Sequence, residues 1–275
     1  MIDPRIENLA KILVNYSVKV KPGDWVVVSA NAIAQPLISE VVRNVLRNGG
    51  HPTVLIDSDE MQEILLSESS DEQLGFVTPV ENLVYDKMDV LISLRADSNT
   101  RTLTGDDPKK QQLRQKARRN LTETYMRRAA EGSLRWILTN FPCQAYAQEA
   151  DMSLSDYEKF VYSATFADQD NPVESWQAFY DRQEKIIEWL KGKKQVVLKG
   201  PNVDLSLSID GRRFINCAGN NNMPDGEIFT GPVEETANGW VRFTYPAITG
   251  GREVDGVELR FEQGKVIEAH AKKNE

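Results

Sequence analysis

Histidine is scarce in this chain. Only His51 and His270 occur among the 275 residues, and they lie far apart in the sequence. An H-E-x-x-H zinc helix is therefore absent, and a serine triad or a papain-like pair would have to use one of these two side chains. The stretch "NGGHP" predicts His51 in a turn, and His270 falls in the last expected strand. We interpret both histidines as structural.

Cysteine is equally rare, and long hydrophobic runs are missing. Cys143 and Cys217 are the only cysteines, and their separation in a chain of this size favours two buried thiols in a reducing compartment. The N-terminus carries Asp3 and Glu7 where a signal peptide needs basic residues, and no later segment reaches membrane-spanning length. The sequence thus predicts a cytoplasmic protein with no membrane partner.

An excess of positive charge is also missing, because the formal net charge is −8. This charge disfavours nucleic acid and anionic membranes as partners. The stretch 109–128 holds eight basic residues, but Leu113, Ala117, Leu121 and Tyr125 recur at intervals of four, so the charges are expected on the solvated side of an amphipathic helix. No G-x-G-x-x-G follows a predicted strand, so no dinucleotide cofactor and no cofactor-binding residue is expected.

The first two-thirds of the chain alternates helical and strand patterns. Asp3 is a good N-cap with Pro4 behind it, which predicts a helix from residue 4 to about 17. "WVVVS", "PTVLID", "DVLISL" and "RWILTN" are short apolar runs typical of buried parallel strands, and helical patterns separate them, including a long helix from about Asp106. We therefore expect an α/β fold whose residues 1–190 form a Rossmann-like domain with a mostly parallel sheet.

From residue 191 the strand patterns dominate. "VVLK", "DLSLSI", "WVRFTY", "VELRFE" and "KVIEAHA" have strand lengths, and the turns at Asp210–Gly211 and within "EQGK" predict hairpins. Residues 191–275 are therefore expected to form a second, β-rich domain. Val257, Leu259 and Phe261 share one face, part of which we expect to be exposed.

One acid stands inside unusual turn chemistry in "NNNMPDGEIFTGPVEET". Asn222, Pro224, Asp225 and Gly226 build a preset turn, and "EIFT" then begins a strand, so the carboxylate of Glu227 is expected at a rigid strand start. Such an acid can coordinate a metal, activate water or accept an ammonium group, and it can also simply cap the turn. Local chemistry leaves these alternatives open.

The stretch "NMPDGEIFTGP", followed by the Asn238–Gly239 turn, resembles the aminopeptidase T and aminopeptidase S family of co-catalytic metallopeptidases, and the resemblance extends to "DPRIENLAKILVNYSVKVKPGDWVVVSA". It implies an α/β N-terminal domain, a metal-bearing C-terminal domain and a homodimer. It implies metal-assisted hydrolysis that releases N-terminal residues from peptide substrates, with two divalent ions such as zinc or cobalt. The glutamate of the motif is a metal ligand in that family, and Glu227 matches it.

The resemblance also implies ligands that this sequence does not match. The family's further ligands, among them two histidines, lie downstream of the strand that corresponds to "KVIEAHAKKNE", and neither His51 nor His270 sits in a matching motif. We therefore expect a chain that lacks the family's C-terminal segments and is inactive by itself, and no catalytic acid or base is assigned. The two hypotheses are a fragment of an active metalloaminopeptidase and a binding or oligomerisation module that kept the fold.

Overall fold

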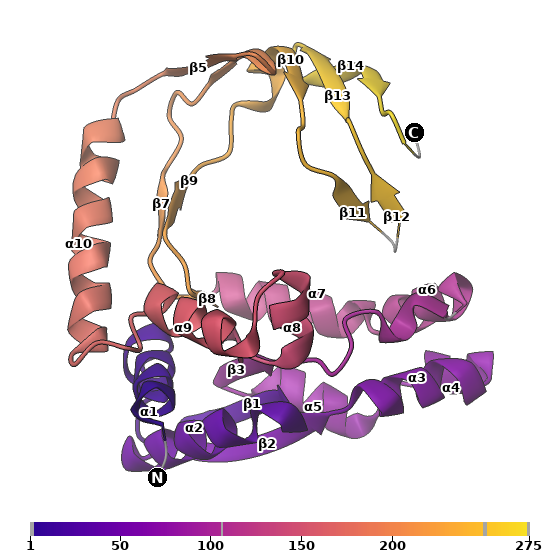
Figure 1. Ribbon diagram of the computed structural model, residues 1–275, viewed down its shortest axis with the longest axis vertical. Helices are drawn as coiled ribbons and strands as arrows, with labels where there is room; N and C mark the ends of the chain where they lie inside the picture. The colour runs from indigo at the N-terminus through magenta and orange to yellow at the C-terminus, as the bar shows by residue number, and fades with distance from the viewer. Residues whose placement is uncertain (1–2, 106, 250–251, 274–275) are drawn as a thin grey trace. The chain divides into compact units, whose positions relative to one another are not determined.

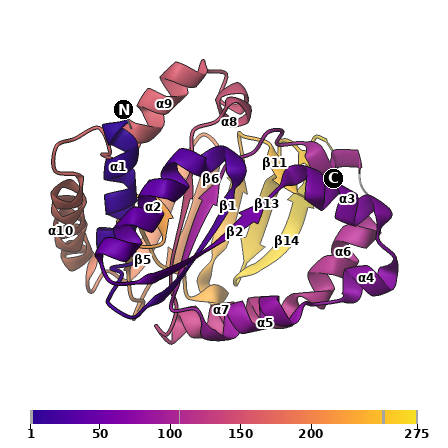
Figure 2. The same ribbon diagram turned by 90° about the horizontal axis from the view of Figure 1, so that it is seen from below.

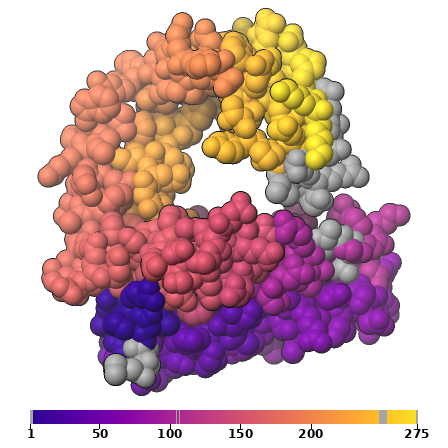
Figure 3. Space-filling model, viewed as in Figure 1, coloured from indigo at the N-terminus to yellow at the C-terminus, as the bar shows by residue number. Residues whose placement is uncertain are grey.

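The structure, a computed structural model, describes residues 3–105, 107–249 and 252–273, which are drawn in colour in Figure 1. Figure 3 shows the same view with space-filling atoms. The chain forms two compact units. The first comprises Met1–Phe179 and Cys217–Gly226, and the second comprises Tyr180–Asn216 and Glu227–Glu275. These units differ in two places from a division at residue 190: the boundary falls inside a helix, and a short later segment returns to the first unit.

The first unit is built on a parallel five-stranded sheet with the order β2-β1-β3-β4-β8. Its strands are β1 (Trp25–Asn31), β2 (His51–Asp57), β3 (Val90–Arg95), β4 (Arg135–Asn140) and the two-residue β8 (Asn222–Met223). Strand β1 lies inside the sheet, and its Val26, Val27 and Val28 are buried, as expected for an apolar run covered on both faces.

Helices cover both faces of this sheet (Figure 2). Asp3 caps α1 (Pro4–Lys11), which continues as a π-helix, η1 (Ile12–Ser17), and packs against α2 (Gln35–Arg47) on one face. On the other face, α5 (Pro79–Lys87) and α7 (Arg119–Ala130) pack around a core of Val27, Val84, Met88 and Leu134. This arrangement follows from right-handed crossovers between parallel strands.

The remaining helical elements of the first unit connect the strands. They are η2 (Ala32–Ala34), α3 (Asp59–Glu68), α4 (Asp71–Gly75), η3 (Thr102–Gly105), α6 (Pro108–Ala117), α8 (Gln144–Glu149) and α9 (Leu154–Ala164). Helix α10 (Pro172–Leu190) begins in this unit and ends in the second. No helix of the described chain is both long enough and apolar enough to cross a membrane.

The second unit contains an antiparallel five-stranded sheet with the order β14-β13-β10-β6-β5. Its strands are β5 (Gln195–Gly200), β6 (Val203–Ser208), β10 (Asn238–Arg242), β13 (Glu258–Glu262) and β14 (Lys265–His270). The predicted hairpin at "EQGK" is present between β13 and β14, where Gln263 and Gly264 have φ of 48° and 77° (Figure 1). Val257, Leu259 and Phe261 are all partly exposed.

Short elements complete the chain. Strands β7 (Ile215–Cys217) and β9 (Glu227–Phe229) pair with each other, and β11 (Ala247–Thr249) pairs with β12 (Arg252–Val254). The 3₁₀ turn η4 (Glu234–Thr236) precedes β10. A turn does occur at Asp210–Gly211, but β6 and β7 belong to different sheets, so the predicted hairpin there is wrong.

Three other expectations need correction. The long helix from about Asp106 is two helices, α6 and α7, that meet at Arg118. The basic residues of this stretch are not all solvated, because Arg128 is buried and donates to the carbonyl oxygens of Tyr85 and Ser133 at 2.8 and 3.1 Å. His51 is not a turn residue, since it begins β2 and its N–H donates to the Asp24 carbonyl.

Candidate functional site

Glu227 is the first residue of β9, at the strand start that the sequence predicts. The turn before it contains a cis peptide bond between Met223 and Pro224, and Gly226 has a φ of 146°. The carboxylate of Asp225 accepts hydrogen bonds from the N–H groups of Gly226 and Gly219, at 2.9 and 3.3 Å. Asp225 therefore closes this turn.

The chain that leads into the turn is held firmly by β4. The N–H of Leu138 donates to the Asn221 carbonyl at 2.9 Å, and the buried hydroxyl of Thr139 donates to the Met223 carbonyl at 2.7 Å. The buried Tyr16 hydroxyl donates to the Ala218 carbonyl at 2.7 Å. These bonds satisfy backbone groups that the two-residue strand β8 leaves open, and they hold this segment within the first unit.

The carboxylate of Glu227 is exposed and forms no hydrogen bond or ion pair with any described residue. Asp225, and not Glu227, therefore caps the turn. The carboxylate of Glu227 is available to bind a ligand. Glu234 and Glu235 lie in η4, seven and eight residues after Glu227, and are also exposed.

The described residues do not complete a metal centre around Glu227. Within residues 3–105, 107–249 and 252–273, no three His, Cys, Asp or Glu side chains are grouped so that they could hold a metal ion. His51 lies at the start of β2 in the first unit, and His270 is the last residue of β14. One carboxylate does not fit a pair of divalent ions, each of which needs about three or four protein ligands.

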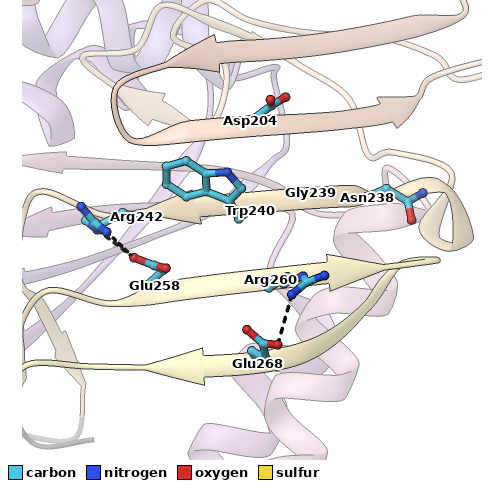
Figure 4. Close-up of a pocket in the computed structure, with 8 residues that line it drawn as sticks. All are labelled: Asp204, Asn238, Gly239, Trp240, Arg242, Glu258, Arg260 and Glu268. Carbon is cyan, nitrogen blue, oxygen red and sulfur yellow. Dashed lines mark hydrogen bonds and ion pairs between the residues drawn. The ribbon is translucent and has the colours of Figure 1, made fainter.

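A cavity of about 700 Å³ lies over the polar face of the antiparallel sheet (Figure 4). Asp204, Trp240, Arg260 and Glu268 are directly opposite one another on four neighbouring strands. Arg260 pairs with Glu268 at 3.2 Å. The charges on this face largely neutralise one another in ion pairs, which is typical of a solvated sheet face.

A smaller cleft of about 290 Å³ lies at the carboxyl ends of the parallel strands, and we call it the switch-point cleft. Its lining is formed by Ser29, Asn31, Asp57, Asp59, Ser93, Leu94, Arg95, Ala96, Asp97 and Leu138. The sequence carries a signal for this cleft that no motif marks. Asp57 ends "PTVLID", and Asp97 is the third residue after "DVLISL". Parallel strands bring their carboxyl ends to one edge of a sheet.

Tyr146, from α8, donates its hydroxyl to Asp97 at 2.9 Å. Burial of the ring and the hydrogen bond to Asp97 both raise the pKa of the Tyr146 hydroxyl, so it remains a neutral donor at physiological pH. Asp97 is thus held in place without receiving a positive charge.

Comparisons with known proteins identify relatives along nearly the whole chain. A family model described as "Thermophilic metalloprotease (M29)" matches residues 2–275. Aminopeptidase 2 of Geobacillus stearothermophilus and aminopeptidase T of Thermus thermophilus are each 25% identical to the chain, over 98% of its length and 70% and 71% of theirs. The solved structure titled "Wild-type AmpT from Thermus thermophilus" matches with a TM-score of 0.83 and 23% identity, over 98% of this chain and 72% of that one, which establishes the shared fold.

Proposed function

The chain belongs to the thermophilic metalloprotease (M29) family. We propose that it is the polypeptide, or part of the polypeptide, of a metal-dependent aminopeptidase, which releases N-terminal residues from peptides by hydrolysis. The proposal is supported by the relatives that match almost all of its length, which carry the name aminopeptidase. The α/β unit with its parallel sheet and the antiparallel sheet that follows supply the scaffold.

We propose Glu227 as a metal ligand of that enzyme. One observation carries this assignment. Asp225 accepts the hydrogen bonds of the turn's N–H groups, whereas the carboxylate of Glu227, two residues further on, is exposed and has no partner among the described residues. Glu227 begins β9, which pairs with β7, so the backbone that carries this carboxylate is held by strand pairing, as a ligand requires.

The finer properties of the enzyme are proposals that the family likeness supports. They are two divalent ions per complete site, of the zinc or cobalt type, a homodimeric assembly and a cytoplasmic location. The described residues provide one ligand, so no hydrolytic step is assigned to them. We expect the 275 residues by themselves to be inactive.

The second candidate is a binding or oligomerisation module that keeps the aminopeptidase fold without the chemistry. The lack of a group of three metal-ligating side chains among the described residues favours it. The two candidates differ in what the natural protein does when metal is supplied and removed.

The test uses the protein purified from its source, assayed on amino-acid p-nitroanilides and short peptides with added zinc or cobalt. Hydrolysis that a chelator abolishes and that metal restores supports the enzyme. The intact mass of the same preparation establishes whether the active polypeptide contains residues beyond these 275. A pure preparation that hydrolyses nothing at any metal concentration supports the binding module.

A further inference from the structure

We propose that the switch-point cleft, which is built from residues of the first unit, binds a small zwitterion with the chemistry of a free α-amino acid. The first step is topological. In the order β2-β1-β3-β4-β8, the chain leaves β1 for β2 on one side and then crosses to β3 on the other side. Ligands of open α/β sheets bind outside the carboxyl ends of the strands where the direction reverses in this way.

A cavity is present at that position. The cleft of about 290 Å³ is lined by the last residues of β1, β2 and β3, and by residues just beyond them. This volume lies just below the range of about 300–1,000 Å³ found for drug-sized ligands, so the occupant is small. A dinucleotide does not fit such a volume.

The carboxylates of the cleft form no ion pair within the part of the chain that the structure describes. Asp57 accepts from the Ser29 hydroxyl at 3.0 Å, and Asp59 accepts from the backbone N–H and hydroxyl of Ser98 at 3.0 and 2.8 Å. Asp97 accepts from the neutral Tyr146 hydroxyl. None of the three carboxylates forms an ion pair with a described residue. The donors fix the carboxylates in place without an ion pair, although Arg114 attracts Asp57 electrostatically, so the carboxylates can accept a cation from outside.

Arg95 supplies the complementary observation. Its side chain lines the same cleft and is exposed, and its guanidinium forms no ion pair or hydrogen bond with a described residue, although carboxylates line the cleft with it. An unpaired guanidinium is a ready partner for a carboxylate group of a ligand, which it can bind with two parallel hydrogen bonds.

These features select one ligand class. Three acids against one arginine repel phosphate groups, and the acids are not grouped so that they could hold a metal ion. An ammonium group suits the aspartates, a carboxylate suits Arg95, and the apolar Leu94 and Leu138 in the lining suit an aliphatic side chain. A free aliphatic amino acid carries all three groups.

Such an amino acid is also what the proposed hydrolysis releases. The binding site does not depend on that reaction, because the cleft is built entirely from residues of the first unit. Binding measured in the presence of a chelator therefore tests the cleft alone, and its failure leaves the proposed function untouched.

The experiment is isothermal titration of the full 275-residue chain with L-leucine, L-leucinamide and N-acetyl-L-leucine, in a buffer with a chelator. We expect saturable binding of leucine and at least tenfold weaker binding of both analogues, because the amide lacks the carboxylate and the acetyl compound lacks the ammonium. Asp57→Asn and Arg95→Gln are each expected to weaken leucine binding at least tenfold, and Arg95→Gln is expected to bind leucinamide as the wild type does.

Glu60→Gln and Arg47→Gln are matched controls, because both residues are exposed and neither lines the cleft. They are expected to bind leucine as the wild type does. The proposal is overturned if leucine fails to bind, if N-acetyl-leucine binds as tightly as leucine, or if Asp57→Asn and Arg95→Gln, with wild-type melting temperatures, keep wild-type affinity. The comparison of ligands on the wild-type chain decides the question even where a variant does not fold.

Discussion

The carboxylate of Asp225 accepts a hydrogen bond from the backbone N–H of Gly219 at 3.3 Å, across the loop that leads to Glu227. Two acids that lie two residues apart thus have different tasks. Asp225 is partly buried and holds the loop, whereas Glu227 is exposed and has no partner among the described residues. Substitutions at the two positions should therefore separate folding from ligand binding.

We expect Glu227→Gln to reduce turnover of the active natural enzyme at least about a hundredfold, about 2.7 kcal/mol of lost transition-state stabilisation, with less bound metal. The change keeps the shape of the side chain and replaces an anionic ligand by a neutral amide oxygen. The measurements are kcat on an amino-acid p-nitroanilide and metal content by elemental analysis, alongside the melting temperature, which should change little.

Glu234→Gln and Glu235→Gln are the controls, since both acids are exposed and are expected to be solvated. They should keep most of the activity and metal. Asp225→Ala should instead lower the melting temperature, because it leaves the Gly219 N–H without its acceptor. Wild-type activity and metal content in Glu227→Gln would contradict the assignment of Glu227 as a ligand.

The 275-residue polypeptide, produced alone, is expected to cleave no amino-acid p-nitroanilide or short peptide, even with zinc, cobalt or manganese added. The reason is the number of ligands, because the described residues offer one carboxylate at the proposed site. Metal-dependent turnover that a chelator abolishes would mean that other side chains complete the site.

Gly219→Ala is expected to destabilise the first unit more than Gly132→Ala does. Both glycines have left-handed φ values, of 82° and 73°, so both variants strain the backbone. A Cβ at Gly219 would also lie 2.5 Å from the Met223 Cε and 3.3 Å from the Trp176 ring, whereas a Cβ at Gly132 meets nothing within 4 Å. Overpacking of this kind costs about 1–3 kcal/mol. Equal free energies of unfolding for the two variants, measured in urea, would contradict this prediction, because they would show that the side chains around Gly219 move aside without loss of stability.

Low pH should reduce the free energy of unfolding of the first unit, partly through protonation of Glu81. Burial acts to raise the pKa of this carboxyl, but hydrogen bonds from the backbone and hydroxyl of Thr78 and from Arg118 outweigh it, and the pKa is lowered from its ordinary value of 4.5. Because the folded-state pKa is depressed, the contribution to stability is present above about pH 4.5 and is lost as the pH falls through the folded-state pKa.

The free energy of unfolding should accordingly fall more steeply between pH 5 and pH 3 for the wild type than for Glu81→Gln. At pH 7 the variant should be less stable by up to about 1 kcal/mol, because glutamine keeps the acceptor of the capping box at the start of α5 but loses the ion pair with Arg118. Parallel pH profiles for the two proteins would contradict this account of Glu81.

Local chemistry was sufficient for much of the fold. Asp3 and Pro4 begin α1 as predicted, the apolar run from Trp25 forms a strand inside a parallel sheet, and Gln263–Gly264 close a hairpin. Each of these features depends on a few adjacent residues whose side chains cap, pack or permit a left-handed φ, so the sequence carries the signal directly.

Features that depend on distant partners escaped prediction. Strand β8 is two residues long and forms by pairing with the edge of β4. The sequence Asn222–Met223 contains no pattern that predicts a strand. The turn at Asp210–Gly211 was correctly placed, but the pairing of β6 with β5 and β10 rather than with β7 is a choice among competing edges. Arg128 is buried because two carbonyl groups, one of them from Tyr85 in α5, accept its hydrogen bonds.

The sequence by itself determined the family, the α/β and β-rich halves, and Glu227 as the acid to examine, because motif, hydrophobic period and turn chemistry are local properties of the chain. Only the tertiary structure decided that Asp225 closes the turn in place of Glu227, and that Asp57, Asp59, Arg95 and Asp97 line one cleft. The reason is physical: hydrogen-bond partners and charge balance are set by which strands lie side by side, and that order is fixed by packing across the whole sheet.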